Sequence, residues 1–255
     1  MGLIMRRNLM AAKSGYTAKD YVQDGLVAMW DGIENAGYAA DGFEHDPNAT
    51  VWKDLSGNGW DLTFPGLGSR PAAWEDVCAT RVLSTRNSSN FAEGSVAAPE
   101  IHVVEAVFQR AYYSNLTYPK TVFQGRQGCA VRIFEAADNE HDCVVFGGYS
   151  TNVGIQIGNL NGIVSVALIM SGAGNSTIVT DFFLNGVRVP DSELVSVTGG
   201  WNANSPYPLI IGGRRVSSND QAFSGRIYRV NCYSSLSAKD VAANYAIDKA
   251  RFNLT

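Results

Sequence analysis

Short apolar segments separated by Gly- and Asn-rich turns run through most of the chain and predict an all-β protein. Their β-branched and aromatic composition is typical of strands. The predicted strands cover residues 26–30, 101–108, 130–134, 143–146, 153–157, 163–169, 209–213 and 225–233. Because no helical pattern alternates with these segments, the strands are expected to form antiparallel sheets arranged as a sandwich or a barrel.

Asn-Gly pairs mark the predicted hairpins at residues 58–59, 161–162 and 185–186. This pair suits the type I′ turn, since both residues tolerate a positive φ. In the clearest case, apolar strands within Thr180–Pro190 flank Asn185 and Gly186. Pro190 is expected to end the second strand.

The last strand and the segment after it predict how the chain ends. Strict alternation puts Ile227, Arg229 and Asn231 on one face, with Tyr228, Val230 and Cys232 on the other. A single helix is then expected, with Ser237 as N-cap and Asp240 in the first turn. This helix is predicted to pack on the outside of the strands.

Residues 1–22 differ from the rest of the chain. They hold Arg6, Arg7, Lys13 and Lys19 but little apolar periodicity, and predict an N-terminal arm with one turn beginning at Thr17. Residues 23–255 then form the β domain. The apolar stretch between the arginines and Lys13 is too short for a secretory signal, and no stretch is long enough to span a membrane.

Composition narrows the classes of function. Of 255 residues, 45% are hydrophobic and only 17% are charged, and the formal net charge is −4. Without a basic cluster the chain is not expected to bind nucleic acid. Its cysteines, Cys78, Cys129, Cys143 and Cys232, lack zinc-ligand spacing and are predicted to be free buried thiols. Pairing of Cys129 with Cys143 across a hairpin is the alternative.

Three segments, taken in order, resemble a known superfamily. They are Gly25-Leu-Val-Ala-Met-Trp-Asp-Gly32, Trp52-Lys-Asp-Leu-Ser-Gly-Asn-Gly-Trp-Asp-Leu-Thr63, and the stretch from Ile211-Gly-Gly through Phe223-Ser-Gly-Arg-Ile-Tyr-Arg-Val to Ala243-Asn-Tyr. Together with Phe183-Leu-Asn-Gly186 they resemble the laminin-G-like branch of the concanavalin A-like lectin/glucanase superfamily, most closely its bacterial and bacteriophage members. The resemblance implies a jelly-roll β-sandwich of two antiparallel sheets, one of them concave, with a short C-terminal helix.

Enzymatic activity is not expected from the residues. Glucanases of this superfamily carry the pattern Glu-x-Asp-x-x-Glu on one strand, where positions two apart share a face. The nearest candidates, Glu135, Asp138 and Glu140, have the wrong spacing. No other catalytic motif is present in the sequence, so the chain is predicted not to be an enzyme.

The acidic segment 54–61 resembles the first half of a calcium-binding loop. Asp54, Ser56, Asn58 and Asp61 supply oxygen ligands at short spacing, but Pro65 replaces the expected Glu at the twelfth position. The favoured interpretation is a structural turn in which these side chains bond to nearby backbone. Ca²⁺ binding is the alternative, and no cofactor is required.

A glycan site needs an aromatic platform with amides or carboxylates beside it. The loop residues Trp201, Asn202, Asn204 and Tyr207 offer this combination, and a following loop adds Asn219 and Asp220. A second aromatic loop lies at residues 112–115. Trp30, Trp52 and Trp60 are assigned to core or second-layer packing.

Two functions are predicted. The first is a non-catalytic structural or adsorption module of a bacteriophage virion, such as a head-decoration, fibre or tail-associated protein made in the host cytoplasm. It would contact other virion subunits through residues 1–22 and take host cell-surface glycans as candidate ligands. The alternative is a bacterial carbohydrate-binding lectin without a recognisable signal peptide.

Overall fold

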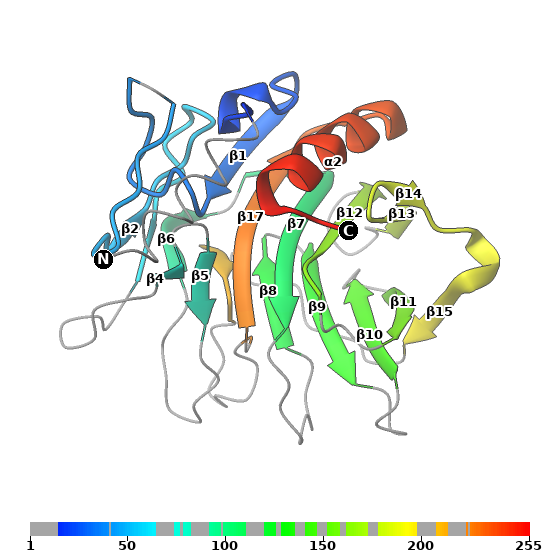
Figure 1. Ribbon diagram of the computed structural model, residues 1–255. Coiled ribbons are helices and arrows are strands. Elements are labelled where there is room, and N and C mark those ends of the chain that lie inside the picture. The colour runs from blue at the N-terminus through cyan, green and yellow to red at the C-terminus, as the bar shows by residue number, and fades with distance from the viewer. Residues whose placement is uncertain are drawn as a thin grey trace.

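The computed structural model describes most of the chain as a β-sandwich (Figure 1). The described residues are 15–40, 42–64, 74–76, 79–82, 92–97, 99–110, 120–125, 129–135, 141–146, 152–158, 162–172, 178–197, 208–213, 223 and 225–255. Among these, all strand pairs are antiparallel, and a single α-helix, α2 (Ala238–Phe252), closes the chain. The predicted all-β sandwich with a C-terminal helix is confirmed.

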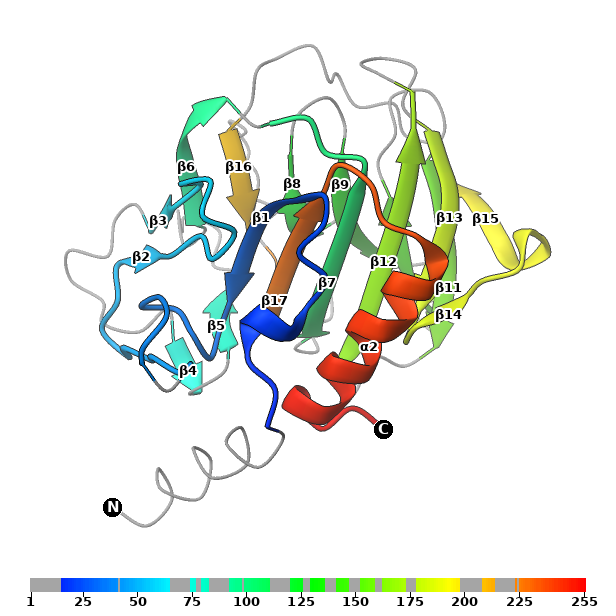
Figure 2. The ribbon, with the colours of Figure 1, turned by 90° about the horizontal axis from the view of Figure 1, so that it is seen from above.

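The first sheet, sheet A, has eight strands in the described part of the chain. In spatial order they are β14 (Val187–Arg188), β13 (Ile178–Leu184), β12 (Val164–Ser171), β7 (Val103–Arg110), β17 (Gly225–Tyr233), β5 (Ala79–Val82) and β4 (Trp74–Asp76), with β1 (Leu26–Asp31) also paired to β17. Helix α2 lies on the outer face of this sheet (Figure 2).

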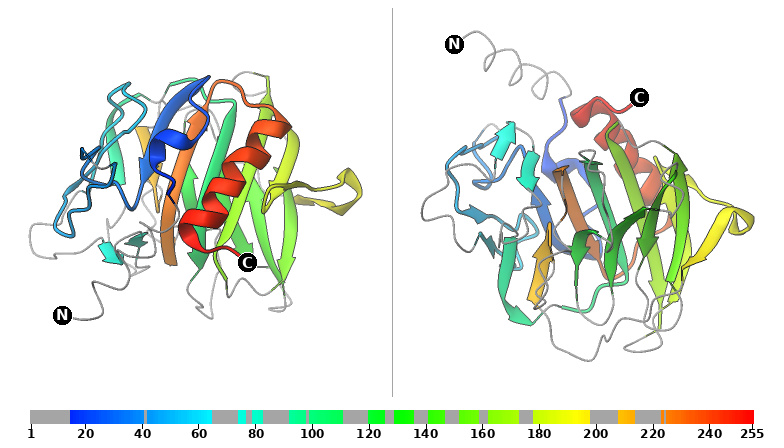
Figure 3. Two further views of the ribbon diagram at one scale, coloured as in Figure 1. Left: turned by 45° about the horizontal axis from the view of Figure 1, so that its top comes forward. Right: turned by 90° about the horizontal axis from the view of Figure 1, so that it is seen from below.

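The second sheet, sheet B, has nine strands among the described residues. Their order is β15 (Leu194–Val197), β11 (Asn152–Gly158), β10 (His141–Phe146), β9 (Ala130–Glu135), β8 (Lys120–Gln124), β16 (Pro208–Ile211), β6 (Ala92–Ala97), β3 (Leu62–Thr63) and β2 (Val51–Trp52). A 3₁₀ turn, η5 (Asp191–Glu193), precedes β15 as the chain passes from sheet A to sheet B. Figure 3 shows the two layers in two further views, one of them from below.

The inner faces of the two sheets bury one large apolar core. Trp30 and Trp52 are fully buried in it, and Trp60 packs against it, as predicted. Cys129 and Cys232 are buried free thiols, which excludes the alternative pairing of Cys129 with Cys143. Burial raises the pKa of Cys129 to about 12.

The Asn-Gly hairpin prediction holds at one position and fails at another. Asn185 and Gly186 have φ values of 49° and 74°, as a type I′ turn requires. Asn58 does not adopt a positive φ, and the residues that do so in that turn are Gly57 and Gly59. Hydrogen bonds made by the side chains of Asp54 and Ser56 hold the turn around Asn58 instead, so it does not form a type I′ hairpin turn.

The predicted alternation along β17 is wrong at its centre. A register shift between Ile227 and Arg229 places Ile227 and Val230 in the core, whereas Tyr228 and Arg229 both lie on the outer side under α2. A β-bulge of this kind inserts one residue into the alternation and reverses the faces after it. It brings Arg229 to the helix.

The N-terminal segment, described from Gly15 onward, packs against the sandwich. Thr17 caps the 3₁₀ turn η1 (Ala18–Asp20) with the predicted capping box. Ala18 and Tyr21 are buried, with 0% and 1% exposure. The described part of the predicted 1–22 arm is therefore held on the sandwich, beside α2 in Figure 3. No described helix is long and apolar enough to cross a membrane.

Candidate functional site

The residues predicted to bind glycan lie outside the described part of the chain. They are Trp201, Asn202, Asn204, Tyr207, Asn219 and Asp220, and the same holds for residues 112–115. These assignments stay predictions. Strands β15 and β16, which flank residues 198–207, both belong to sheet B. The outer face of sheet B is therefore a candidate for the site.

Strand register defines which side chains lie on the outer face of sheet B. Val131 and Ile133 of β9 point into the core, so Arg132 between them points outward. Thr121 of β8 lies directly opposite Arg132. Gln124 lies opposite Ala130 on one side and Ile210 on the other, so it shares their face. We call Thr121, Gln124, Arg132 and Ile210 the sheet B patch.

Two oxygen atoms of the sheet B patch have no hydrogen-bond partner among the described residues. Thr121, Arg132 and Gln124 are 0%, 3% and 4% exposed. Nevertheless Thr121 Oγ1 and Gln124 Oε1 make no hydrogen bond to that part of the chain. Most buried polar side-chain atoms in proteins are paired, so two orphans on one strand face need an explanation. A ligand that supplies hydroxyl groups would satisfy both.

The sheet B patch continues toward one edge of the sheet. Ile210 lies opposite Glu93 of β6, and Glu93 lies opposite Thr63 of β3. Glu93 is half-buried and Thr63 is exposed. Carboxylate, amide, hydroxyl and guanidinium groups therefore follow one another across the sheet, and this set can accept and donate hydrogen bonds to a polyhydroxylated molecule.

The sequence interpretation missed the sheet B patch because it did not identify β8. That strand contributes only Lys-Thr-Val-Phe-Gln, too short for a clear periodic pattern. A register shift between Thr121 and Phe123 further hides the alternation. The available signal was Val122 and Phe123 flanked on both sides by polar residues.

The acidic turn predicted as a calcium candidate is held together by its own hydrogen bonds. Asp54 Oδ1 accepts from the backbone N–H groups of Met29 and Ser56, each at 2.9 Å. Its Oδ2 accepts from the Ser56 hydroxyl at 2.8 Å and from Trp60 N–H at 2.9 Å. This arrangement matches the structural-turn interpretation, since donors already occupy both carboxylate oxygens.

The remaining residues of the turn make comparable contacts. Asp61 Oδ1 accepts from the backbone N–H of Asp54 at 2.9 Å, and its Oδ2 accepts from Lys53 Nζ at 2.8 Å. The Asn58 amide donates to the carbonyl of Val27 at 2.9 Å. In the described part of the chain, no three His, Cys, Asp or Glu side chains converge as a metal site. Ca²⁺ binding here stays a prediction, tested below.

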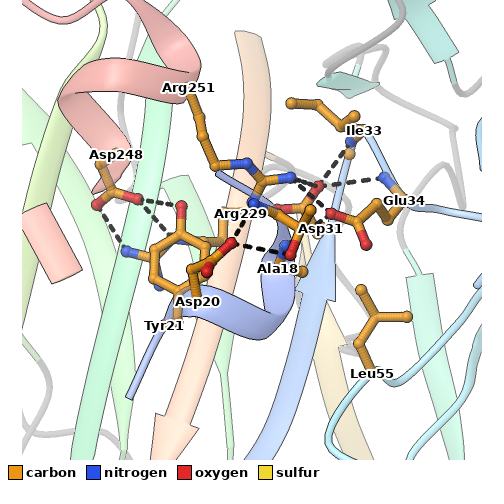
Figure 4. A network of polar contacts seen from close by, with 12 residues as sticks. Ala18, Asp20, Tyr21, Asp31, Ile33, Glu34, Leu55, Arg229, Asp248 and Arg251 are labelled. Carbon is orange, nitrogen blue, oxygen red and sulfur yellow. Dashed lines mark hydrogen bonds and ion pairs between the residues drawn. The ribbon is translucent and has the colours of Figure 1, made fainter. Parts of the chain in front are cut away.

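A second polar region lies under α2 on the outer face of sheet A (Figure 4). Arg229 is fully buried, and its Nε and Nη2 donate to the two oxygens of Asp248 at 2.8 and 2.7 Å. Its Nη1 donates to Glu105 Oε2 at 3.1 Å. Asp248 thus pairs bidentately with one edge of the guanidinium, and Glu105 accepts from the other terminal nitrogen.

Arg251 of α2 repeats this arrangement beside it. Its Nη1 donates to Asp31 Oδ2 at 2.6 Å, and its Nη2 donates to Asp31 Oδ1 at 3.2 Å. The same Nη2 donates to Glu34 Oε1 at 2.9 Å. The ring of Tyr21 lies against both guanidinium groups, 4.5 Å from that of Arg229 and 5.5 Å from that of Arg251. We call Tyr21 and these six ionisable residues the charge cluster.

Burial shifts the two glutamates of the charge cluster toward their neutral forms. Burial, opposed by Arg229, raises the pKa of Glu105 to about 7. Burial together with Asp31, opposed by Arg251, raises the pKa of Glu34 to about 7. The arginines and aspartates of the charge cluster already pair with one another, so the charge cluster is described as a structural network rather than as a recognition site.

Comparison with known proteins defines the class of fold. No protein-family model and no curated protein matches the chain. Among solved structures, it is similar to Trypanosoma rangeli sialidase in complex with 2,3-difluoro-KDN, at 13% identity and a TM-score of 0.55, over 97% of this chain and 39% of that one. The same sialidase with 2,3-difluorosialic acid gives 15% identity and a TM-score of 0.52, over 94% and 36%. These similarities show the fold alone, a β-sandwich.

Carbohydrate-binding domains are also among the similar structures. One is domain 4 of AbnA, a GH43 extracellular arabinanase from Geobacillus stearothermophilus, in complex with arabinotriose. It is 11% identical, with a TM-score of 0.48, over 87% of this chain and 98% of the domain. The β-sandwich fold expected from the resemblance is confirmed, whereas the laminin-G-like branch and the phage members stay predictions.

The prediction that the chain is not an enzyme is contradicted by the comparison. The sialidases it resembles are enzymes, and the chain spans only 36% to 39% of their length. The prediction rested on the absence of contiguous catalytic motifs, whereas catalytic groups are commonly brought together from distant parts of a chain. The absence of a contiguous motif therefore did not justify excluding enzymes.

Proposed function

We propose that the chain is a carbohydrate-binding β-sandwich module and that the sheet B patch belongs to its sugar site. One observation carries the proposal: the buried Thr121 Oγ1 and Gln124 Oε1 lack partners on the same outer face as Arg132. Sugar hydroxyls both donate and accept hydrogen bonds, so they suit a threonine hydroxyl and an amide oxygen. The similar sialidases, whose structures hold sialic-acid derivatives, support this class of ligand.

The proposal is tested with Thr121→Val and Gln124→Met, measured by retention on a glycan array. Each substitution removes the polar atom while keeping nearly the same shape. We expect each to reduce retention by about tenfold, the effect of one lost hydrogen bond of about 1–1.5 kcal/mol. The melting temperature of Thr121→Val should stay the same or rise, because the buried hydroxyl has no partner within the protein.

Thr180→Val is the matched control. Thr180 lies exposed on β13 of sheet A, and its hydroxyl donates to the carbonyl of Ile169. Retention should be unchanged in this variant. Full retention in both sheet B variants would contradict the proposed site, and Trp201→Ala then tests whether the loop predicted from sequence binds the glycan instead.

A finer proposal concerns where the module acts. On the sequence resemblance, we propose that it serves as an adsorption module of a phage virion, with the basic residues Arg6, Arg7 and Lys13 contacting neighbouring subunits. Because residues 15–22 pack on the sandwich, deletion of residues 1–14 is the appropriate test. The truncated protein should fold normally and fail to enter particles. Normal incorporation would show that residues 1–14 are not the contact with neighbouring subunits, and failure of the full-length protein to enter particles would favour the bacterial lectin.

A further inference from the structure

The charge cluster has more buried carboxylates than it has buried cations. Arg229 and Arg251 face four acids, Asp31, Asp248 and the two glutamates discussed above. If every group were ionised, the cluster would carry two uncompensated negative charges in a region without solvent. Uncompensated buried charge is strongly unfavourable, so the cluster is balanced only when two of the four carboxyl groups are protonated.

Hydrogen bonding identifies which acids stay ionised. Asp248 accepts four bonds, two from Arg229 and one each from the hydroxyls of Tyr21 and Ser165. Asp31 also accepts four, two from Arg251 and two from the backbone N–H groups that follow it. Donors to both oxygens favour the charged form. Each aspartate is therefore the ionised partner of one arginine.

The two glutamates accept fewer hydrogen bonds than the two aspartates. Glu34 Oε1 accepts from Ala18 N–H and Arg251, but its Oε2 is buried without a partner. Glu105 Oε2 accepts from Arg229 and from the Asn244 amide. Glu34 and Glu105 are thus the surplus acids, held next to the ionised Asp31 and Asp248 respectively.

Other groups around the two glutamates do not outweigh the effect of burial. Around Glu34, the Lys19 ammonium, which is exposed and lies 4.2 Å from the centre of the Tyr38 ring, and the Ala18 N–H both lower the pKa of Glu34, but burial and Asp31 raise it further. Around Glu105 the other titratable groups are Tyr233 and Cys232, whose pKa values burial raises far above neutral. Tyr21 likewise stays a neutral phenol, because burial raises its pKa.

The N-terminal strap, residues 16–22, is attached to the sandwich chiefly through this region. Ala18 N–H donates to Glu34 at 2.7 Å, the Tyr21 hydroxyl donates to Asp248 at 2.8 Å, and Val22 N–H donates to the Asn244 amide oxygen at 2.9 Å. Asn244 in turn donates to Glu105. The strap contains one three-residue 3₁₀ turn, so these anchors and the burial of Ala18 and Tyr21 hold it in place.

We propose that the charge cluster is a pH-sensitive latch, which holds the N-terminal strap closed while Glu34 and Glu105 are protonated and releases it when they ionise. Both glutamates have an ordinary pKa of 4.5 and a pKa of about 7 when buried. Because each glutamate binds its proton more tightly in the closed form, the closed form loses stability as pH rises from 4.5 to about 7. Above pH 7 the loss levels off. The strap, residues 16–22, would thus be freed at neutral and alkaline pH.

The test is amide hydrogen exchange of Ala18 and Val22 in the full chain at several pH values from 5 to 8.5, corrected for the intrinsic exchange rate. Protection of these amides should fall at least about tenfold as pH rises toward 7, and then level off. Constant protection of both amides across this range would overturn the proposal, whatever the variants show.

Glu34→Gln and Glu105→Gln, alone and combined, assign the effect to the two carboxyls. Glutamine imitates the protonated acid, so the double variant should keep strap protection constant with pH. Glu193→Gln, exposed in η5, is the matched control and should retain the wild-type pH dependence. An unchanged pH dependence in a folded double variant would also overturn the latch.

Discussion

The outer faces of the two sheets differ in how their buried polar groups are paired. Under α2, on sheet A, two arginines and two aspartates form bidentate ion pairs, and among the described residues only Glu34 Oε2 and Arg251 Nε of this cluster lack a partner. On sheet B, Thr121 and Gln124 are equally buried but keep polar atoms without partners. A satisfied buried network fixes the position of the elements around it, whereas an unsatisfied polar group costs stability and is typical of sites retained for recognition.

The largest change in the free energy of unfolding is expected from a substitution in the charge cluster on sheet A. Arg229→Met removes a buried cation and leaves Asp248 charged without its partner. Loss of one partner of a buried ion pair costs about 3–5 kcal/mol. Urea unfolding should show a decrease in the free energy of unfolding of that size. A loss below about 1 kcal/mol would mean that the cluster contributes little to holding α2.

Arg188→Met is the matched control for this measurement. Arg188 pairs with Asp181 and Asp191 on the exposed edge of sheet A. Solvent screens such pairs, so this variant should unfold close to the wild type.

A smaller effect is expected from the strap. Tyr21→Phe removes one hydrogen bond to the ionised Asp248 while keeping the ring between the two arginines. Hydrogen bonds to charged groups contribute about 1.5–3 kcal/mol, and urea unfolding should show a loss in that range. Tyr245→Phe on α2, whose hydroxyl donates to no residue of the charge cluster, serves as control. Equal stability of the Tyr21 and Tyr245 variants would argue that the strap is held by apolar packing alone.

The smallest effect is expected at the turn around Asp54. Because N–H and O–H donors already satisfy both of its carboxylate oxygens, Ca²⁺ would have to displace them. We expect the same melting temperature with millimolar Ca²⁺ and with a chelator. A ligand that binds only the native state must raise the melting temperature, so an increase with Ca²⁺ would establish the metal site instead.

The strands that sequence predicted well are those with long apolar runs. Residues 101–108, 163–169 and 225–233 correspond to β7, β12 and β17, which form the centre of sheet A. Strands β2 and β3 have two residues each, and their pairing depends on neighbours distant in sequence. Short strands carry too few positions for a pattern, so only tertiary pairing reveals them.

The site residues were harder to predict for the same reason. Ser237 and Asp240 were correctly predicted as a cap, since the capping box depends only on residues three apart. Arg229 was predicted to share a face with Ile227, and this is wrong because a bulge between the two residues is not visible in strict alternation. Nothing local to Thr121 or Gln124 indicated that their polar atoms would be buried without partners.

The sequence by itself determined the β class, the Asn185-Gly186 turn, the capped C-terminal helix and the buried tryptophans, because propensities and short-range hydrogen bonds decide these features. Only the tertiary structure decided which polar groups meet. Glu105, Arg229 and Asp248 lie on three separate elements, and their shared burial joins them into one electrostatic unit. Their protonation is set by the loss of solvent at that junction, a property of the packed protein that no stretch of sequence contains.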